Sequence, residues 1–530
     1  MNQVQQSYDR TPYLSMAYTE SSIYKLEAIA TFLGLKPASI EQARILEIGC
    51  AFGGNLIPMA LANPDSEFIG IDISATQINH GKKIIQELGI KNIKLIQQDI
   101  LNLAGSFRNA TTPPPQLSIF QTKFDYIITH GVYSWVPDDV KNAILFLSAK
   151  LLKPTGLAYI SYNTYPGWKQ QDIIRDLMNY ASRDTTNDSR KLSLAKKVLK
   201  TYAKSMLQSD DAYRQKSFHP LLNETIESVL NNNNDSYILH EYLEEYNDPC
   251  YFTDFVTQAR KYGLEYLIDA LMIPTYVTFT NDFGHLDRIE KEQYGDFLCN
   301  RNFRASILTH PSNIPTTNQS LNLHFAHTDL DKLEFFGSFI IKDDHITNAA
   351  GTSKHPKSYA TLAQELTAHY PNTITLKYLI DKYPEKKKEF YQQIACLISY
   401  SVIGFLKHKL ETFDYEKGNV RLKPRYIKYF DYFARNENPF ICLSNLLNNN
   451  VKLNASQAKF ALMFDGINSK QDIINAAKKF MLDTKQYFII TRQDGSKYTI
   501  TDPVEMDKTC NIFITEIMDT LKNHYFFEKF

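Results

Sequence analysis

Three acidic residues stand near the ends of three short apolar runs in the first hundred residues. Glu47 lies in "RILEIGC", Asp72 in "EFIGIDIS", and Asp99 closes "IKLIQQD". Because the carboxyl ends of parallel strands meet at one edge of a sheet, we expect the three carboxylates to lie together there. Such a group accepts hydrogen bonds from ligand hydroxyl and amino groups. Taken singly, each acid is also explained as a helix N-cap or turn residue.

The turn after the first apolar run contains glycines but lacks the dinucleotide pattern. A nicotinamide-binding turn has Gly-x-Gly-x-x-Gly, whereas this chain has Gly49, Ala51 and Gly54 at those places. The acid Glu47 stands two residues before the first glycine and favours a cationic ligand. S-adenosylmethionine carries a sulfonium, an amino group and no phosphate. It therefore suits the pattern Glu-x-Gly-x-x-x-Gly, which ends at Gly53.

These residue types predict a specific set of contacts with S-adenosylmethionine, whose demethylated product is S-adenosyl-L-homocysteine. We expect Asp72 to accept both ribose hydroxyls and Asp99 to accept from the adenine amino group. Ile73 and Ile100 are expected to enclose the adenine ring. The other expected cofactor-binding residues come from the glycine turn and the end of the fourth strand: Gly49, Ala51, Gly53, Asn55 and His130.

Two loops rich in aromatic residues follow the fourth and fifth expected strands. They read "THGVYSWVP" and "SYNTYPGWK" and contain both tryptophans of the chain. A methyl acceptor needs an available lone pair, and an apolar pocket lowers the pKa of a lysine amine by disfavouring its ammonium form. Aromatic walls do this while tolerating a cation. The candidate catalytic residues are His130, Tyr133, Trp135, Tyr162 and Trp168. Structural roles remain open for all of them, and for His130 a structural or cofactor contact is favoured over a general base.

Alternating elements place these residues on a sheet. Between residues 45 and 162, apolar runs alternate with helix-like stretches, which predicts an α/β fold with a doubly wound, Rossmann-like parallel sheet. Residues 251–272 repeat a helix followed by a strand and are expected to complete that sheet. The expected divisions are a core (1–168), a helical insert (169–235), a completing region (236–285), and mixed α/β middle (286–420) and C-terminal (421–530) domains.

The helical insert carries an apolar seam with spacing 3-4-3-4. Its members are Leu192, Ala195, Leu199, Tyr202 and Met206. A seam of this kind packs against a neighbouring helix, either within the same bundle or on a second copy of the chain. The second alternative predicts a homodimer.

Composition excludes several classes of partner and site. Lys+Arg and Asp+Glu both number 58, so no overall field favours nucleic acid or an anionic membrane. The six cysteines form no CxxC pair, which is typical of reduced thiols and predicts a cytoplasmic protein. The longest apolar stretch, 394–406, is shorter than the roughly 18 residues that a membrane span needs. His324 and His327 lack a nearby third ligand, so we expect no metal site.

Several motifs together resemble a known family. "LEIGCAFGGNL", "GIDIS", "THGVYSWVP" and "SYNTYPGWK" resemble class I methyltransferases that carry a methyltransferase regulatory region, and "HEYLEEYNDPCYFTDFVTQARKYGLEYL" with "EQYGDFLCNRNFR" resembles that region. The full-length arrangement is similar to the rickettsial protein-lysine methyltransferases that act on outer membrane protein B. The resemblance implies a cofactor-binding core, a dimerisation insert, a middle domain and a C-terminal domain. Ala51 departs from it, because many class I enzymes have glycine there.

Three functions are compatible with these features. The first is methylation of lysines in a protein substrate, an exported surface protein. The second is methylation of a small molecule, and the third is non-catalytic binding of the cofactor by a regulator. The resemblance to the regulatory region ends near residue 305, and the long remainder to residue 530 exceeds what a small metabolite requires. This length favours the protein substrate.

Overall fold

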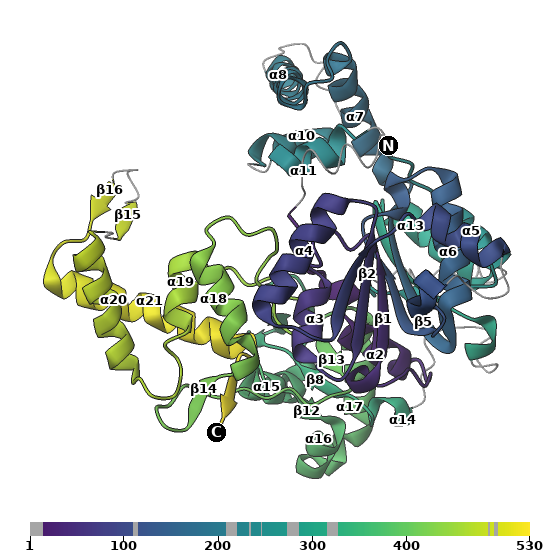
Figure 1. The fold of residues 1–530 in the computed structure, drawn as a ribbon. Coiled ribbons are helices and arrows are strands. Elements are labelled where there is room, and N and C mark those ends of the chain that lie inside the picture. Colours follow the sequence, from purple (N-terminus) through teal and green to yellow (C-terminus); the bar gives the residue numbers. More distant parts are fainter. Residues whose placement is uncertain are drawn as a thin grey trace.

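A seven-stranded sheet with the order β3-β2-β1-β4-β5-β7-β6 lies at the centre of the N-terminal half (Figure 1). The first five strands are parallel, and β7 runs antiparallel to both of its neighbours. The strands are β1 Arg44–Ile48, β2 Glu67–Asp72, β3 Ile93–Gln97, β4 Phe124–Thr129, β5 Leu152–Asn163, β6 Glu265–Asp269 and β7 Phe303–Thr309. The parallel sheet predicted from the sequence is present. It also extends past residue 285, where we expected the core to end, because β7 inserts between β5 and β6.

The computed structural model describes residues 14–109, 115–207, 220–232, 235–244, 246–272, 286–314, 327–485, 488–491 and 497–530. The expectation that involves His324 lies outside the described residues, as do the first 13 residues.

Alternate residues along the strands point to two different cores. Ile45 of β1 packs with helices α2 (Ile23–Phe32), α3 (Leu56–Ala62) and α4 (Ala75–Leu88), whereas Leu46 packs on the other face. That second face is covered by α5 (Ile100–Asn109), α6 (Asp138–Leu151) and α12 (Phe252–Lys261). Continuous apolar strands are expected when both faces of a parallel sheet are buried.

Local sequence signals set the ends of helix α4. The Ser74 side chain accepts a hydrogen bond from the backbone N–H of Gln77, which satisfies one of the unpaired donors at the start of the helix. Gly89 ends the helix with φ 72°, a left-handed conformation that glycine adopts without a Cβ penalty. These two residues therefore fix where α4 begins after β2 and where it ends before β3. Because Asp72 is the last residue of β2, the start of α4 also helps to fix the position of Asp72.

The helical insert follows β5 as a small bundle. Its helices are α7 Trp168–Ser182, α8 Asp188–Leu207, α10 Pro220–Asn231 and α11 Asp235–Tyr242. The seam residues Leu192, Ala195 and Leu199 are buried here against Ile174, Met178, Leu222 and Ile226 of the same chain. For these three residues the alternative of packing within the same bundle therefore holds, whereas dimerisation of the insert stays a prediction.

The middle region packs under the core through a buried ion pair. It contains two small sheets, with the strand orders β12-β8-β13 and β11-β10-β9, and helices α15 Ala360–His369, α16 Leu376–Lys382 and α17 Lys387–Ser399. The strands are β8 Glu334–Phe336, β9 Phe339–Ile341, β10 His345–Asn348, β11 Lys354–Pro356, β12 Ile374–Thr375 and β13 Gly404–Leu406. The fully buried carboxylate of Glu27 on α2 lies 3.2 Å from Lys407 Nζ and 2.7 Å from His408 Nε2. Because an unpaired buried charge is costly, this contact ties the region to the core.

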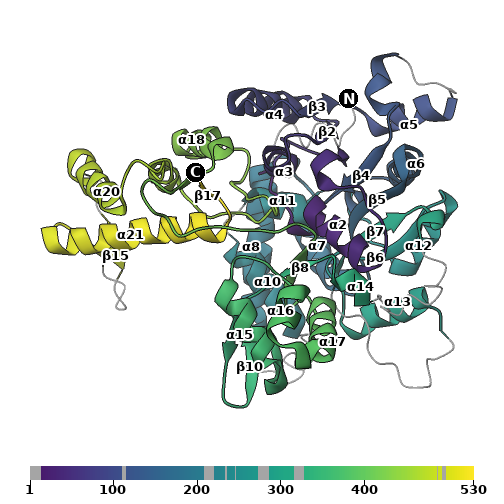
Figure 2. The same ribbon diagram turned by 90° about the horizontal axis from the view of Figure 1, so that it is seen from below.

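The C-terminal region lies beside the core helices α3 and α4. Its helices are α18 Ile427–Arg435, α19 Ala455–Ala461, α20 Lys470–Thr484 and α21 Pro503–Asn523, and β14 Val420–Leu422 pairs with β17 Phe527–Lys529. Figures 1 and 2 show α18 next to the core helices, with α20 and α21 extending away from them. Arg435 Nη2 of α18 lies 2.7 Å from Glu87 Oε1 of α4. Among the described helices, none has both the length and the apolar character needed to cross a membrane.

The buried seam yields a stability prediction. We expect Leu199→Ala to lower the free energy of unfolding by about 2–5 kcal/mol, because the substitution leaves a cavity in the bundle, and to leave the oligomeric state unchanged. Chemical denaturation and light scattering measure the two quantities. Ile173→Ala is the control, because Ile173 is 51% exposed on the same bundle. A shift toward a smaller assembly with unchanged unfolding would contradict the prediction.

Candidate functional site

Glu47 is a buried acid near the carboxyl end of β1. Its Oε1 accepts a hydrogen bond of 2.7 Å from Asn55 Nδ2, whereas Oε2 is buried and has no hydrogen-bond partner among the described residues. Burial raises the pKa of Glu47 to about 8, the Asn55 hydrogen bond opposes the rise, and the charge of Asp72 adds to it. An unsatisfied buried acceptor is costly in a folded protein. The site is therefore suited to a ligand that brings a positively charged hydrogen-bond donor.

The glycine turn brings the backbone close to its neighbours. Gly49 has φ 78° and Gly53 has φ 83°, both in the left-handed region. A Cβ on Gly49 would lie 2.4 Å from Val132 Cγ2, so this position admits only glycine. Ala51 also has a positive φ, 49°, and its backbone N–H donates to Asp72 Oδ2 at 2.9 Å. The residue that departs from the family pattern thus orients an acid of the site.

Asp72 ends β2 as a half-exposed carboxylate held in place by backbone donors. Besides the bond from Ala51, its Oδ1 accepts from the backbone N–H of Ser74 at 2.9 Å. Each carboxylate oxygen has a second lone pair, so the group can still accept from a ligand hydroxyl. Ile73 follows directly and is partly exposed. This arrangement matches the ribose-binding role expected for Asp72, which stays a prediction.

Asp99 acts as a helix N-cap, which is the structural role that its position in the sequence also allowed. Its Oδ1 accepts hydrogen bonds from the backbone N–H groups of Leu101 (2.7 Å) and Asn102 (3.4 Å), which caps the start of α5. Ile100 begins the same helix and packs partly against the second core. Contact of Asp99 and Ile100 with adenine remains a prediction.

His130 follows the last residue of β4 and lies within a cluster of aromatic rings. Its ring stacks on Tyr18 with 3.6 Å between centroids and an angle of 23°, and its Nδ1 is 2.9 Å from Tyr159 Oη. Phe303 of β7 lies 6.1 Å away. Burial lowers the pKa of His130 to about 3, so the imidazole is neutral at physiological pH and is a weak base. Sequence reasoning missed Tyr18 and Phe303, which come from segments outside the two aromatic loops.

The other candidate catalytic residues form two separate pairs. Tyr133 and Tyr162 are buried in the second core, where the Tyr162 ring stacks on Phe255 at 4.1 Å. Trp135 is half-buried and meets Trp168 edge to face at 6.3 Å. Trp168 Nε1 is buried without a hydrogen-bond partner in the part of the chain that is described. The structure therefore does not bring the five residues into one cluster, and their catalytic roles stay predictions.

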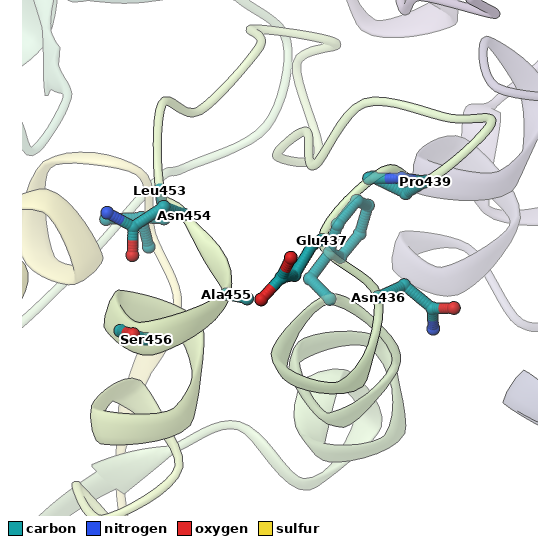
Figure 3. A pocket seen from close by; sticks show the side chains of 8 residues that line it. Asn436, Glu437, Pro439, Leu453, Asn454, Ala455 and Ser456 are labelled. Atoms are coloured by element: carbon teal, nitrogen blue, oxygen red, sulfur yellow. The ribbon is translucent and has the colours of Figure 1, made fainter. Parts of the chain in front are cut away.

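A separate hollow of about 330 Å³ lies in the C-terminal region (Figure 3). The Glu437 side chain points into it from the chain after α18, toward Ala455 at the start of α19. The lining residues are Phe433, Asn436, Glu437, Pro439, Leu453, Asn454, Ala455 and Ser456. None of them belongs to the cofactor or aromatic residues described above, so this hollow is distinct from the predicted site.

Comparisons with known proteins match the chain over this region. Residues 40–230 match a family model described as a methyltransferase domain, and residues 234–310 match one described as a predicted methyltransferase regulatory domain. Uncharacterized protein RP789 of Rickettsia prowazekii (strain Madrid E) is 31% identical over 510 residues, which cover 88% of this chain and 85% of that protein. The chain belongs to the methyltransferases that carry this regulatory domain.

Two further likenesses extend the match. Uncharacterized protein RP028 of the same organism is 39% identical over 255 residues, covering 48% of the methyltransferase and 94% of that protein. The structure of PKMT2 from Rickettsia typhi in complex with AdoHcy has a TM-score of 0.79 and 26% sequence identity, and the match covers 97% of this chain and 100% of that one. The Rossmann-like fold predicted from the sequence is confirmed, as is S-adenosylmethionine as the cofactor of the methyltransferase.

The residues present fit S-adenosylmethionine. The unsatisfied Oε2 of Glu47 requires a donor, which the amino group of the cofactor can supply. Gly49 and Gly53 adopt left-handed conformations (φ 78° and 83°) that give the turn its shape, and a Cβ at Gly49 would clash with Val132. Asp72 presents a fixed carboxylate of the kind that accepts two vicinal hydroxyls. Glu47 and Asp72 are therefore the residues of this methyltransferase that we expect to hold the two polar ends of the cofactor.

The raised pKa of Glu47 predicts pH-dependent cofactor binding. A cationic ligand prefers the ionised carboxylate, but a group with a pKa of about 8 is mostly protonated at pH 7. Affinity should therefore rise between pH 6 and pH 7.5, by up to about tenfold per pH unit, and binding should release a proton. Calorimetry in buffers of different ionisation enthalpy measures both. Glu47→Gln should bind more weakly and lose the dependence, whereas a flat wild-type profile would contradict the assignment.

A second prediction concerns Asp72. We expect Asp72→Asn to weaken cofactor binding at least tenfold, because hydrogen bonds to a charged group contribute about 1.5–3 kcal/mol each. Isothermal titration with the cofactor measures the affinity. Asp65→Asn removes an exposed acid from the turn before β2 and should bind normally. Equal affinities for the two variants would exclude the ribose contact.

Proposed function

We propose that this methyltransferase transfers methyl groups from S-adenosylmethionine to lysine side-chain amines of a protein substrate. The main support is the extent of the match to PKMT2, which covers 97% of this chain. The match includes the middle and C-terminal regions, which lie beyond the methyltransferase and regulatory models that end at residue 310. A large acceptor would make use of these added surfaces.

Methyl transfer to an amine requires positioning more than acid-base catalysis. When bound, the cofactor would supply an electrophilic methyl group: a lysine that has already lost one ammonium proton to solvent forms the N–C bond with its lone pair, the S–C bond breaks, and its electron pair stays on sulfur. The residues of the chain exclude water and orient the amine. The neutral ring of His130, stacked on Tyr18, does not repel a cationic sulfonium.

The half-buried Trp135 is the favoured wall of the acceptor site. It lies in the turn Tyr133–Trp135, which closely follows His130 at the end of β4. Its partner Trp168 starts α7 immediately after the second aromatic loop. Tyr133 and Tyr162 are instead buried in the second core. The proposal therefore gives Trp135 the contact with the amine and the two tyrosines a supporting role.

Incubation with labelled cofactor tests the proposed acceptor. We expect label on lysines of an unfolded fragment of an outer-membrane surface protein, such as outer membrane protein B, the target implied by the family resemblance. The matched control is the same fragment with lysines changed to arginine, and mass spectrometry identifies the modified residues. Label on a small amine but not on the fragment would favour the small-molecule alternative. Cofactor binding without transfer to any acceptor would favour a non-catalytic regulator.

Trp135→Ala separates acceptor orientation from cofactor binding. We expect single-turnover methyl transfer to fall by about 100-fold, because a misplaced amine loses its productive geometry, while cofactor affinity stays within about twofold of the wild type. Phe146→Ala in α6 is a control for an aromatic residue away from the loops. Equal losses of binding and transfer would show that Trp135 supports the fold, and full activity would place the acceptor elsewhere.

Two further expectations accompany the proposal. The family resemblance implies a homodimer, and the cysteine content predicts a cytoplasmic location. Both stay predictions. With the seam of α8 buried in its own bundle, a dimer would have to use other surfaces of the insert.

A further inference from the structure

The side-chain amide of Asn55 joins three distant parts of the chain. Its Nδ2 donates to Glu47 Oε1 at 2.7 Å, as described above. Its Oδ1 accepts from the backbone N–H of Tyr18 at 3.0 Å and from Asn448 Nδ2 at 2.7 Å. Asn55 is 3% exposed and Asn448 is fully buried. Water therefore does not compete for these hydrogen bonds, and their geometry decides how the amide lies.

The partners of Asn55 determine which way its amide faces. A backbone N–H can only donate, so the atom facing Tyr18 must be the oxygen. Asn448 Nδ2 also bonds to the backbone oxygen of Asn55 at 3.1 Å, which fixes the donor end of Asn448 against Asn55. If the Asn55 amide turned over, its NH₂ group would face two donors and Glu47 would lose its hydrogen bond. Tyr18 and Asn448 thus lock the amide toward Glu47.

Asn448 belongs to a tight loop of the C-terminal region, which we call the asparagine loop (residues 444–450). Asn445 Oδ1 accepts from the backbone N–H groups of Leu447 and Asn449, both at 3.0 Å, which closes the loop. Asn448 has φ 60°, a conformation that asparagine tolerates better than most residues.

The asparagine loop also holds the N-terminal segment over the glycine turn. Asn449 Oδ1 accepts from Thr19 Oγ1 at 2.9 Å, and Asn450 Nδ2 donates to the backbone oxygen of Ala17 at 2.9 Å. Ser15 in turn contacts the glycine turn, because its Oγ accepts from the backbone N–H of Gly54 at 3.0 Å. Consecutive residues of the loop therefore bind the segment that carries Tyr18.

We propose that Asn448 is a positioning residue of the cofactor site, through which the C-terminal region fixes the Asn55 amide and so aims the Glu47 carboxyl at the amino group of S-adenosylmethionine. The proposal rests on the assignment of Glu47 to the cofactor and is independent of which acceptor is methylated. It makes a region far along the chain part of the cofactor site. The methyltransferase core then has its full cofactor affinity only when the asparagine loop is docked.

The titration of Glu47 reports on this geometry. The titratable groups that face it are Asp72 on the neighbouring strand and the thiol of Cys50, whose pKa burial raises well above its usual value. The asparagine loop contributes only neutral side chains. The Asn55 hydrogen bond lowers the pKa of Glu47, so loss of the amide orientation should raise that pKa and move the pH midpoint of cofactor binding upward.

The test is Asn448→Gly in the full-length chain. Glycine keeps the left-handed backbone and removes only the amide. We expect the dissociation constant for S-adenosylmethionine at pH 7 to rise at least about fivefold, since one buried hydrogen bond contributes about 1 kcal/mol, with the pH midpoint of binding shifted upward. Asn448→Asp is the second variant, because it keeps the shape but presents an acceptor to the oxygens of Asn55. This variant should show the same rise in the dissociation constant and the same shift of the pH midpoint. It provides the test if the glycine variant does not fold.

Two controls separate positioning from general docking. Lys485→Gly replaces another left-handed residue of the C-terminal region, at the end of α20, and should leave binding unchanged. Arg435→Ala removes the contact with Glu87 without touching Asn55 and should leave the pH midpoint unchanged. The proposal is overturned if a folded Asn448 variant binds the cofactor with unchanged affinity. It is also overturned if the variant binds more weakly with no shift in the pH midpoint and Arg435→Ala weakens binding in the same way. If Glu47→Gln itself binds normally, the Glu47 assignment fails instead.

Discussion

The structure around the predicted cofactor site depends on the burial of one acid, Glu47. An ionised carboxylate is costly in a protein interior, so Glu47 is tolerated there only as a protonated group or with donors around it. The protein supplies one donor, the Asn55 amide, and leaves the second oxygen unsatisfied among the described residues. Asn55 in turn is held by the N-terminal segment and by the asparagine loop. A single hydrogen-bond chain therefore links the ligand site to both halves of the molecule.

This arrangement also explains why the polypeptide around the glycine turn is so closely packed. Gly54 lies against Ser15, where a Cβ would come within 2.2 Å of the backbone oxygen. Phe52 in the same turn stacks on Phe440 of the C-terminal region with 4.9 Å between centroids. The stacked rings of Phe52 and Phe440 shield one side of the turn from water. On the other side, the hydrogen bonds of the Asn55 and Asn448 amides hold the turn in place. The turn is thus a junction between regions as well as the loop predicted to bind the cofactor.

Much of the fold and part of the site follow from local sequence patterns. The alternation of apolar runs and helices predicted the parallel sheet, and the spacing of the acids placed Glu47 and Asp72 at its carboxyl edge. Sequence patterns were less informative where the same pattern is compatible with a structural role and with a binding role. Asp99 caps a helix with the same carboxylate that was expected to bind the ligand, and the seam of α8 is buried within its own bundle. A periodic seam records that a neighbour exists but not which chain supplies it.

Contacts between distant segments could not be predicted in this way. Tyr18 stacks on His130, and Asn448 bonds to Asn55, yet neither pair leaves a local pattern. The asparagine run at 448–450 has the composition of an ordinary loop, and only the packing of the C-terminal region against the core gives it a partner. The aromatic loops illustrate the same limit, because composition does not distinguish Trp135, which is half-buried, from Tyr162, which is in the core.

The sequence separation between Asn55 and Asn448, 393 residues, has a consequence for synthesis on the ribosome. At about 5–20 residues per second, roughly 20–80 s pass between the translation of these two residues. During that interval the nascent sheet can form while the Asn55 amide still lacks its most distant partner. With Asn448 positioning Glu47 as proposed, full affinity for the cofactor is acquired late, after most of the polypeptide has left the exit tunnel.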